Sequence, residues 1–257
     1  MNKNIGLVLS GGGVRGVAHI GVLKVLEEEG IEVSHVSGTS AGSIVGSLYA
    51  ADYSPEEILE FFEKSEVFSI SNYALFKPGI IDTGKLVKLF EKFFPEDSFE
   101  ALSKKLFVMA TDLEKAKSKV FHSGELITTV LASSAFPMMF SPITIDDVLY
   151  ADGGIMNNFP IEPLQDKCDK IIGVYVNPIN SIDKEELSSS LAIAERSYHL
   201  SIGAASVQKF DQFDLVICPS ELAKFATFNV KQIKKIYQIG YDAAKRQREE
   251  IIRLCNG

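Results

Sequence analysis

The sequence contains no tryptophan, few cysteines and fewer basic than acidic residues. Cys168, Cys218 and Cys255 are far apart, form no CxxC pair and are odd in number, which disfavours both a disulfide framework and a zinc site. Lys and Arg total 26 against 34 Asp and Glu, so the formal net charge is -8. Proteins that bind nucleic acids neutralise phosphates with basic side chains, so we predict no nucleic-acid partner for this acidic chain.

The sequence also predicts neither a secretory signal peptide nor a membrane-spanning helix. Residues 1–6 run directly into a short apolar stretch and then glycines, unlike a secretory signal peptide. Residues 126–145 are uncharged, but Ser, Thr and Pro interrupt them, which favours a buried helix followed by a turn over a membrane span. Because the cysteine pattern also suits a reducing compartment, we predict a cytoplasmic protein.

Short apolar, β-branched runs alternate with helix-like periodicity along the chain. The length of 257 residues and the apolar content of 46% suit one hydrophobic core, so we predict a single domain over residues 1–257. Strands are predicted at residues 5–9, 33–36, 106–111, 119–122, 143–145, 148–151, 171–176 and 215–218. Helices are predicted at residues 14–28, 41–51, 55–65, 83–93 and 187–210, with linker-like residues at 72–79 and 181–186. This order favours a layered α/β fold with a mainly parallel central sheet.

The C-terminal segment, residues 221–257, differs in charge from the rest of the chain. It carries eight basic and four acidic residues, a net charge of +4. One hypothesis is that a basic face makes transient contact with a membrane surface through anionic lipid head groups. The favoured alternative is a solvated amphipathic helix that packs Ile233, Ile236, Tyr237 and Gly240 inward.

A glycine-rich loop, Gly11-Gly12-Gly13-Val14-Arg15-Gly16, connects the first predicted strand to the first predicted helix and matches GxGxxG. A dinucleotide site also needs an acidic residue at the end of the next strand, and residues 33–38 end without one. A P-loop needs Lys-Ser or Lys-Thr after the glycines, and neither is present. What remains is that converging backbone N–H groups at a helix start can hold an anion, including a transition-state oxyanion.

A GxSxG motif, Gly38-Thr39-Ser40-Ala41-Gly42, follows the second predicted strand and precedes a helix. This context is typical of a nucleophilic serine that is raised above a sheet edge on a strained turn. The flanking glycines, Gly38 and Gly42, are required because neighbouring backbone passes close to the serine. An ordinary tight turn is the alternative interpretation.

A nucleophilic serine needs a base, and histidine is the usual one. None of the histidines follows a strand end as a triad base does, so we expect structural roles for His19, His35, His122 and His199. The motif Asp152-Gly153-Gly154 does follow a predicted strand. A partly buried carboxylate there can accept a proton from a nearby hydroxyl, although the motif taken alone is also a common turn.

The three motifs together resemble the patatin-like phospholipases, and specifically their short single-domain bacterial members. Residues 11–16 are similar to the family's oxyanion block, residues 38–42 to its nucleophile block and residues 152–154 to its dyad block. Further likeness lies in residues 132–137, 140–142 and 157–160, and the resemblance extends over about residues 5–176.

The resemblance implies a three-layer α/β/α fold and a Ser-Asp dyad, in which Ser40 is the nucleophile and Asp152 the base. The amides of Gly11, Gly12 and Gly13, with Ala41 as a further candidate, would form the oxyanion hole, and Arg15 would hold the loop or add positive potential. Gly38, Gly42, Gly153 and Gly154 would shape the elbow and the turn. The chain departs from many members at Ser10, where they have Asp, and at Gly154, where they have Ala.

These residues predict a phospholipase A-like enzyme or carboxylesterase that acts on a lipid or other acyl ester without a metal or organic cofactor. Two alternatives use the same residues, namely an acyltransferase and a lipid-binding regulatory protein with little turnover. Ser133 and Ser134 lack flanking glycines, so we expect them in a helix or a pocket wall. Met138, Met139 and Phe140 either line an acyl groove or pack in the core.

Overall fold

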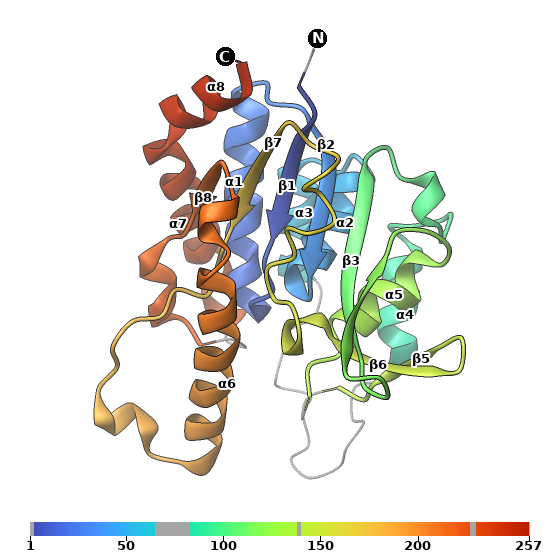
Figure 1. The fold of residues 1–257 in the computed structure, drawn as a ribbon, viewed down its shortest axis with the longest axis vertical. Helices are drawn as coiled ribbons and strands as arrows, with labels where there is room; N and C mark the ends of the chain where they lie inside the picture. The colour runs from blue at the N-terminus through green and yellow to red at the C-terminus, as the bar shows by residue number, and fades with distance from the viewer. Residues whose placement is uncertain (1–2, 65–82, 138–139, 227–229, 257) are drawn as a thin grey trace.

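The computed structural model describes residues 3–64, 83–137, 140–226 and 230–256. Its strands are β1 (Ile5–Leu9), β2 (Val33–Thr39), β3 (Lys105–Asp112), β4 (Lys117–Phe121), β5 (Ile143–Ile145), β6 (Val148–Asp152), β7 (Lys170–Val174) and β8 (Leu215–Ile217). Within these described ranges the eight strands form one sheet in the order β5-β6-β3-β2-β1-β7-β8, with β4 paired to β3 (Figure 1). The pairings from β3 through β2, β1 and β7 to β8 are parallel, and those of β4, β5 and β6 are antiparallel. The predicted α/β class with a mainly parallel central sheet is confirmed.

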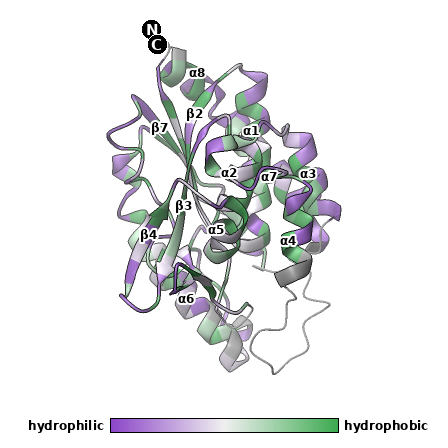
Figure 2. Ribbon diagram, turned by 90° about the vertical axis from the view of Figure 1, so that its right-hand side faces the viewer, coloured by the Kyte–Doolittle hydropathy of each residue, from purple (hydrophilic) through white to green (hydrophobic). Residues whose placement is uncertain are grey.

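The helices are α1 (Val17–Glu28), α2 (Ala41–Ala50), α3 (Pro55–Lys64), α4 (Thr83–Glu91), α5 (Leu126–Ser133), α6 (Ser190–Val207), α7 (Ile233–Arg246) and α8 (Arg248–Asn256). Figure 2 shows α1, α2, α3 and α7 on the same side of the sheet. Leu7 and Leu9 of β1 belong to the core on this side, whereas Val8 belongs to a second cluster with Phe159 and Leu164 from the segment between β6 and β7. A strand buried on both faces in this way is typical of a parallel sheet with a layer on each side.

The sequence-based boundaries differ by up to three residues at an element's end, as at β2, which runs to Thr39 instead of residue 36. Ser37 and Gly38 have no strong strand preference, but β1 on one side and β3 on the other supply pairing partners. As a result Ser40 follows the strand directly. Helix α6 begins at Ser190 instead of residue 187, because the Ser189 side chain accepts the Ala192 amide as an N-cap.

Within residues 126–145 the structure has the buried helix α5 and the strand β5, as predicted, and residues 138–139 lie outside the described residues. Nowhere in the described ranges does a helix combine the length and the hydropathy that a bilayer crossing requires. The linker-like residues 72–79 lie outside the described residues, and residues 181–186 lead into the short 3-10 helix Lys184–Leu187.

The basic C-terminal segment contains two helices, α7 and α8, and α7 packs along α1. Ile236 and Gly240 are buried, and Ile233 and Tyr237 are partly buried against the core, which agrees with the predicted inward face. The contact with α1 is close because Gly240 has no side chain. A Cβ atom at this position would lie 2.0 Å from the carbonyl oxygen of Ala18.

Candidate active site

Ser40 occupies the sharp turn between β2 and α2. Its φ of 53° and ψ of -126° lie outside the regions that non-glycine residues prefer. The flanking glycines make the turn possible, since a Cβ atom at Gly38 would lie 2.5 Å from the Gly42 carbonyl oxygen. One at Gly42 would lie 2.2 Å from the carbonyl oxygen of Leu9. The residue pattern and the backbone geometry are those of a nucleophile elbow.

The strained backbone of Ser40 is held by two neighbouring serines. Its amide donates a hydrogen bond to Ser133 Oγ at 2.9 Å, and Ser133 Oγ donates in turn to the carbonyl oxygen of Met109 at 2.6 Å. Ser43 Oγ donates to the Ser40 carbonyl oxygen at 2.7 Å. Ser133 is therefore a buried support for the turn, in keeping with the expectation that it is a helix residue and not a rival nucleophile.

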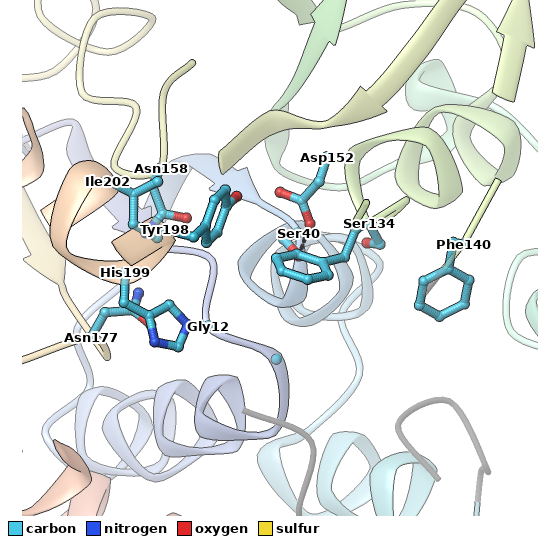
Figure 3. A pocket seen from close by; sticks show the side chains of 12 residues that line it. Gly12, Ser40, Ser134, Phe140, Asp152, Asn158, Asn177, Tyr198, His199 and Ile202 are labelled. Carbon is cyan, nitrogen blue, oxygen red and sulfur yellow. Dashed lines mark hydrogen bonds between the residues drawn. The ribbon is translucent and has the colours of Figure 1, made fainter. Parts of the chain in front are cut away.

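Asp152 ends β6 and faces Ser40. Ser40 Oγ donates a hydrogen bond to Asp152 Oδ2 at 2.7 Å (Figure 3). The Gly154 amide donates to the other carboxylate oxygen, Oδ1, at 2.7 Å. Burial raises the pKa of Asp152 to about 6, although the hydrogen bonds from Ser40 and Gly154 oppose that rise. Such a carboxylate is ionised at neutral pH and is basic enough to accept a proton from a hydroxyl.

The register of the sheet brings these two distant residues together. Thr39, the residue before Ser40, pairs with Met109 of β3, and Ala110, the next residue of β3, pairs with Asp152 of β6. Thr111 Oγ1 also donates to the Asp152 carbonyl oxygen at 2.9 Å. Strand β3, which lies between β2 and β6, thus fixes the spacing between the Ser40 hydroxyl and the Asp152 carboxylate.

The glycine loop lies beside Ser40, but its three glycines have different environments. The Gly11 amide donates to the Asn158 carbonyl oxygen at 3.2 Å. Gly12 and Gly13 line the pocket that contains Ser40, and neither amide donates to another described residue. Gly12 and Gly13 are thus better placed than Gly11 to donate to an oxyanion. Gly11 instead leaves room for Ser40, because a Cβ atom added at Gly11 would lie 3.1 Å from the Cβ atom of Ser40.

The other amide expected near an oxyanion belongs to Ala41, the first residue of α2. No described residue accepts a hydrogen bond from it, as is usual in the first turn of a helix. The Ala41 amide therefore remains a candidate donor.

Arg15 is buried beneath the loop, with 5% of its surface exposed. Its Nε donates to the Gly12 carbonyl oxygen at 3.4 Å, and its Nη2 lies 3.3 Å from His199 Nε2 of α6. Burial, and then the charge of Arg15, lower the pKa of His199 to about 3, so this ring is neutral and accepts a hydrogen bond from the guanidinium. Arg15 therefore connects the loop to α6.

The remaining histidines lie in structural positions. His19 Nε2 is 2.8 Å from the Ser10 carbonyl oxygen, and burial lowers the pKa of His19 to about 4. His35 stacks on Phe107, and the ring of His122 lies 5.6 Å from the same phenylalanine. Ser40 Oγ donates to a carboxylate instead of an imidazole, as the sequence pattern indicates.

The pocket beside Ser40 and Asp152 has apolar and polar walls. Its apolar side chains include Phe136, Phe140, Tyr198 and Ile202, and its polar ones include Ser134, Asn158, Asn177 and His199. From the sequence, Phe140 is expected either in an acyl groove or in the core, and it lines this pocket. Met138 and Met139 lie outside the described residues. Sequence reasoning missed Asn177, Tyr198, His199 and Ile202, because they follow the last motif and no local pattern marks them.

Three polar atoms in the pocket wall are buried and have no partner in the described part of the chain. They are Ser134 Oγ, Asn158 Nδ2 and Asn177 Oδ1. A buried polar group without a partner costs about 1–3 kcal/mol, so a polar part of a bound ester that reached them would be favoured.

Ser10 and Gly154, the two positions at which the sequence departs from the pattern it resembles, both lie in close contact with other residues. Ser10 is fully buried, and its Oγ accepts the Val176 amide at 3.0 Å. A Cβ atom at Gly154 would lie 2.8 Å from Asn158 Oδ1 and 3.3 Å from the hydroxyl of Tyr198. Glycine at this position therefore leaves room for two pocket residues.

Comparison with known proteins agrees with this arrangement. A family model described as patatin-like phospholipase matches residues 7–164, more than half of the chain. An uncharacterised protein of Acanthamoeba polyphaga mimivirus is 28% identical and covers 97% of this chain and 94% of its own length. Lysophospholipase NTE1 of Yarrowia lipolytica is 29% identical over 70% of this chain, which spans 13% of that protein. VipD from Legionella pneumophila has a similar fold, with a TM-score of 0.61, 14% identity and coverage of 97% of this chain and 67% of VipD.

Proposed function

The chain belongs to the patatin-like phospholipase family, and we propose that it hydrolyses acyl esters of lipids through a covalent intermediate on Ser40. The observation that carries this proposal is the 2.7 Å hydrogen bond from Ser40 Oγ to the buried carboxylate of Asp152. Gly12 and Gly13 line the same pocket, and no described residue accepts a hydrogen bond from their amides. The name of the yeast relative supports a phospholipid or lysophospholipid as the ester that is cleaved.

In the first half of the reaction, Asp152 accepts the proton of Ser40 while Ser40 Oγ attacks the ester carbonyl carbon. Negative charge develops on the carbonyl oxygen, and the amides of Gly12 and Gly13, with Ala41 as a further donor, stabilise it. Arg15 keeps the loop in position through the Gly12 carbonyl oxygen. The alcohol then leaves with the proton from Asp152, and the acyl group remains on Ser40.

In the second half, Asp152 accepts a proton from a water molecule that attacks the acyl-enzyme. The same amides stabilise the second oxyanion, and the proton returns to Ser40 Oγ as the fatty acid leaves. One carboxylate therefore serves as base and acid in turn, and no imidazole is needed. This role requires a carboxyl group whose pKa lies close to the working pH.

The pH dependence of turnover follows from the pKa of Asp152. The base acts only when ionised, and burial raises its pKa to about 6. The value of kcat/KM for an uncharged ester should therefore be flat above about pH 6 and fall about tenfold per pH unit below it. Initial rates across this range, with circular dichroism to confirm that the chain stays folded, measure the midpoint. A midpoint near the ordinary aspartate value of about 3.9 would contradict a buried, desolvated base.

Release of free fatty acid from lysophosphatidylcholine and phosphatidylcholine tests the reaction itself. We expect fatty acid as the product from at least one of them, at a rate that added alcohol does not divert. Transfer of most of the acyl group to the alcohol would instead identify an acyltransferase with the same acyl-enzyme. No acyl release from either lipid or from a soluble short-chain ester would exclude the proposed activity.

A further inference from the structure

Helix α6 forms part of the wall of the catalytic pocket. On one face, Tyr198, His199 and Ile202 line the pocket, and Gly203 and Ser206 are buried. In Figure 1 the N-terminal half of this helix extends past the end of β1, on the side toward which β1 points. Because Ser40 follows the parallel strand β2, this is also the end at which the dyad lies. Whatever contacts the outer face of α6 is therefore next to the site.

The outer face of α6 carries large apolar side chains that are exposed. Ile193, Leu200 and Val207 are 50%, 42% and 48% exposed and follow one another at intervals of seven residues. That spacing places them on one stripe, which is about 21 Å long at 1.5 Å per residue. Ile179 precedes the helix, is 40% exposed and adds apolar surface at the side of α6, where its side chain packs against the buried Gly203. These are four of the seven most exposed large apolar side chains in the described chain.

Between these side chains the same face carries one charged residue, Arg196, whose Nη2 donates a hydrogen bond to the Asn180 carbonyl oxygen at 2.6 Å. Ser197, Ser201 and Ala204 are exposed there. A helix that is apolar on both faces is normally buried on both. An exposed apolar stripe of this length is typical of an interaction surface. Its one cation, Arg196, is already hydrogen-bonded to a backbone carbonyl oxygen, so apolar contact outweighs charge and favours a partner that is itself apolar or without net charge.

The basic C-terminal segment is a weaker candidate for contact with lipid. Lys245 pairs with Glu28 and Glu29, and Arg248 pairs with Glu29. Arg246 pairs with Glu221 at 3.2 Å. Glu28 and Glu29, which lie outside this segment, therefore offset part of the positive charge that would attract anionic head groups.

We propose that the stripe of Ile179, Ile193, Leu200 and Val207 docks the chain on the surface of a zwitterionic lipid bilayer. This inference rests on the proposed function, because an enzyme that cleaves lipid esters must take its substrate from a membrane or micelle. The inner face of α6 lines the pocket, so docking of its outer face places the pocket at the lipid surface. Apolar side chains, and not charge, supply the binding free energy.

Flotation of the full chain with phosphatidylcholine vesicles tests the proposal. We expect the wild-type chain to bind. The partition coefficient of the double variant Ile193→Gln, Leu200→Gln should be lower by at least about tenfold, because two large apolar side chains are lost from the contact. Binding should be nearly the same at low and high salt and should not require anionic lipid. The control variant Leu113→Gln, Leu149→Gln removes side chains that are 42% and 37% exposed outside α6, and should bind like wild type.

Several results would overturn the proposal. They are absence of binding to these vesicles, equal loss in the control variant, and binding that depends on anionic lipid and disappears at high salt. Light scattering provides a further test, because a wild-type dimer that the α6 variant converts to a monomer, without a change in vesicle binding, would identify a second copy of the chain as the occupant.

Two measurements separate this proposal from the proposed function. Turnover of a soluble short-chain ester should be unchanged in the α6 double variant, since Ile193 and Leu200 do not line the pocket. The Ser40→Ala variant should bind vesicles like wild type. Ester turnover without vesicle binding would exclude the docking surface alone, and vesicle binding without any ester turnover would exclude the enzymatic function alone.

Discussion

The Asp152→Asn variant should hydrolyse esters at least about a thousandfold more slowly than wild type while remaining folded. Asparagine has nearly the same shape and can still accept the hydrogen bond from Ser40, but it cannot take its proton. The proposed mechanism contains no second base in the described part of the pocket, where His199 is held neutral and directed to Arg15. The loss should therefore appear in kcat more than in KM, and steady-state kinetics with a soluble ester measures both.

Asp112→Asn is a matched control for this variant. Asp112 is 2% exposed, as is Asp152, and it lies on the neighbouring strand β3. Its carboxylate accepts the amides of Glu114 and Lys115, and an asparagine oxygen can do the same. Its turnover should stay within about threefold of wild type, because Asp112 contacts no reacting group. Equal rates for Asp152→Asn and wild type would show that another residue is the base.

Replacing Ser40 with alanine should lower ester turnover by about ten thousandfold or more, since no acyl-enzyme can form. Replacing it with glycine should abolish turnover to the same extent but give a more stable protein. The two variants differ by one methyl group at a residue with a φ of 53° and a ψ of -126°. Glycine accepts that conformation readily, so its free energy of unfolding should exceed that of the alanine variant by about 1–3 kcal/mol.

Urea unfolding of both Ser40 variants measures this difference. Comparison of the two variants is cleaner than comparison with wild type, because both lose the hydrogen bond to Asp152 and leave the same buried carboxylate. Equal stabilities would mean that the turn at Ser40 is not strained. Turnover near the wild-type rate in either variant would exclude Ser40 as the nucleophile.

The parts of the site that the sequence predicts are those that local chemistry determines. The strand-to-helix turn at Ser40 needs its glycines for steric reasons, and the same is true of Gly153, where a Cβ atom would lie 2.2 Å from the Met109 carbonyl oxygen. Parallel strands also end at a common edge, so motifs after successive strands are expected to meet there. These rules place the glycine loop after β1 and Ser40 after β2 in one region of the fold. Asp152 ends the antiparallel strand β6, and its place beside Ser40 comes from the pairing of β6 with the end of β3, which local sequence does not indicate.

Features that depend on distant segments could not be predicted in this way. The Gly11 amide is directed toward Asn158, a residue far along the chain, and nothing in the glycine loop itself indicates which of its amides is engaged. The pocket wall formed by Tyr198 and Ile202 was missed for a related reason. Because α6 has apolar residues on both faces, its periodicity does not indicate which face turns toward the site.

The pKa of Asp152 is also a property of the fold and not of its motif. Burial is the main cause of the rise, and that burial comes from β3, α5 and the segment after β6 packing around the end of the strand. Asp152-Gly153-Gly154 in an exposed turn would leave the carboxyl near its ordinary pKa. The sequence can therefore suggest a carboxylate base, but tertiary packing decides its strength.

Reaction of the folded chain with an alkyl fluorophosphonate, followed by mass spectrometry of its peptides, tests the central claim most directly. Such a probe forms a stable bond only with an activated serine hydroxyl. We expect one adduct per chain, located on Ser40, and a much slower reaction in the Asp152→Asn variant. An adduct on Ser133 or Ser134, or no adduct on folded protein, would contradict the claim that Asp152 activates Ser40 as the nucleophile.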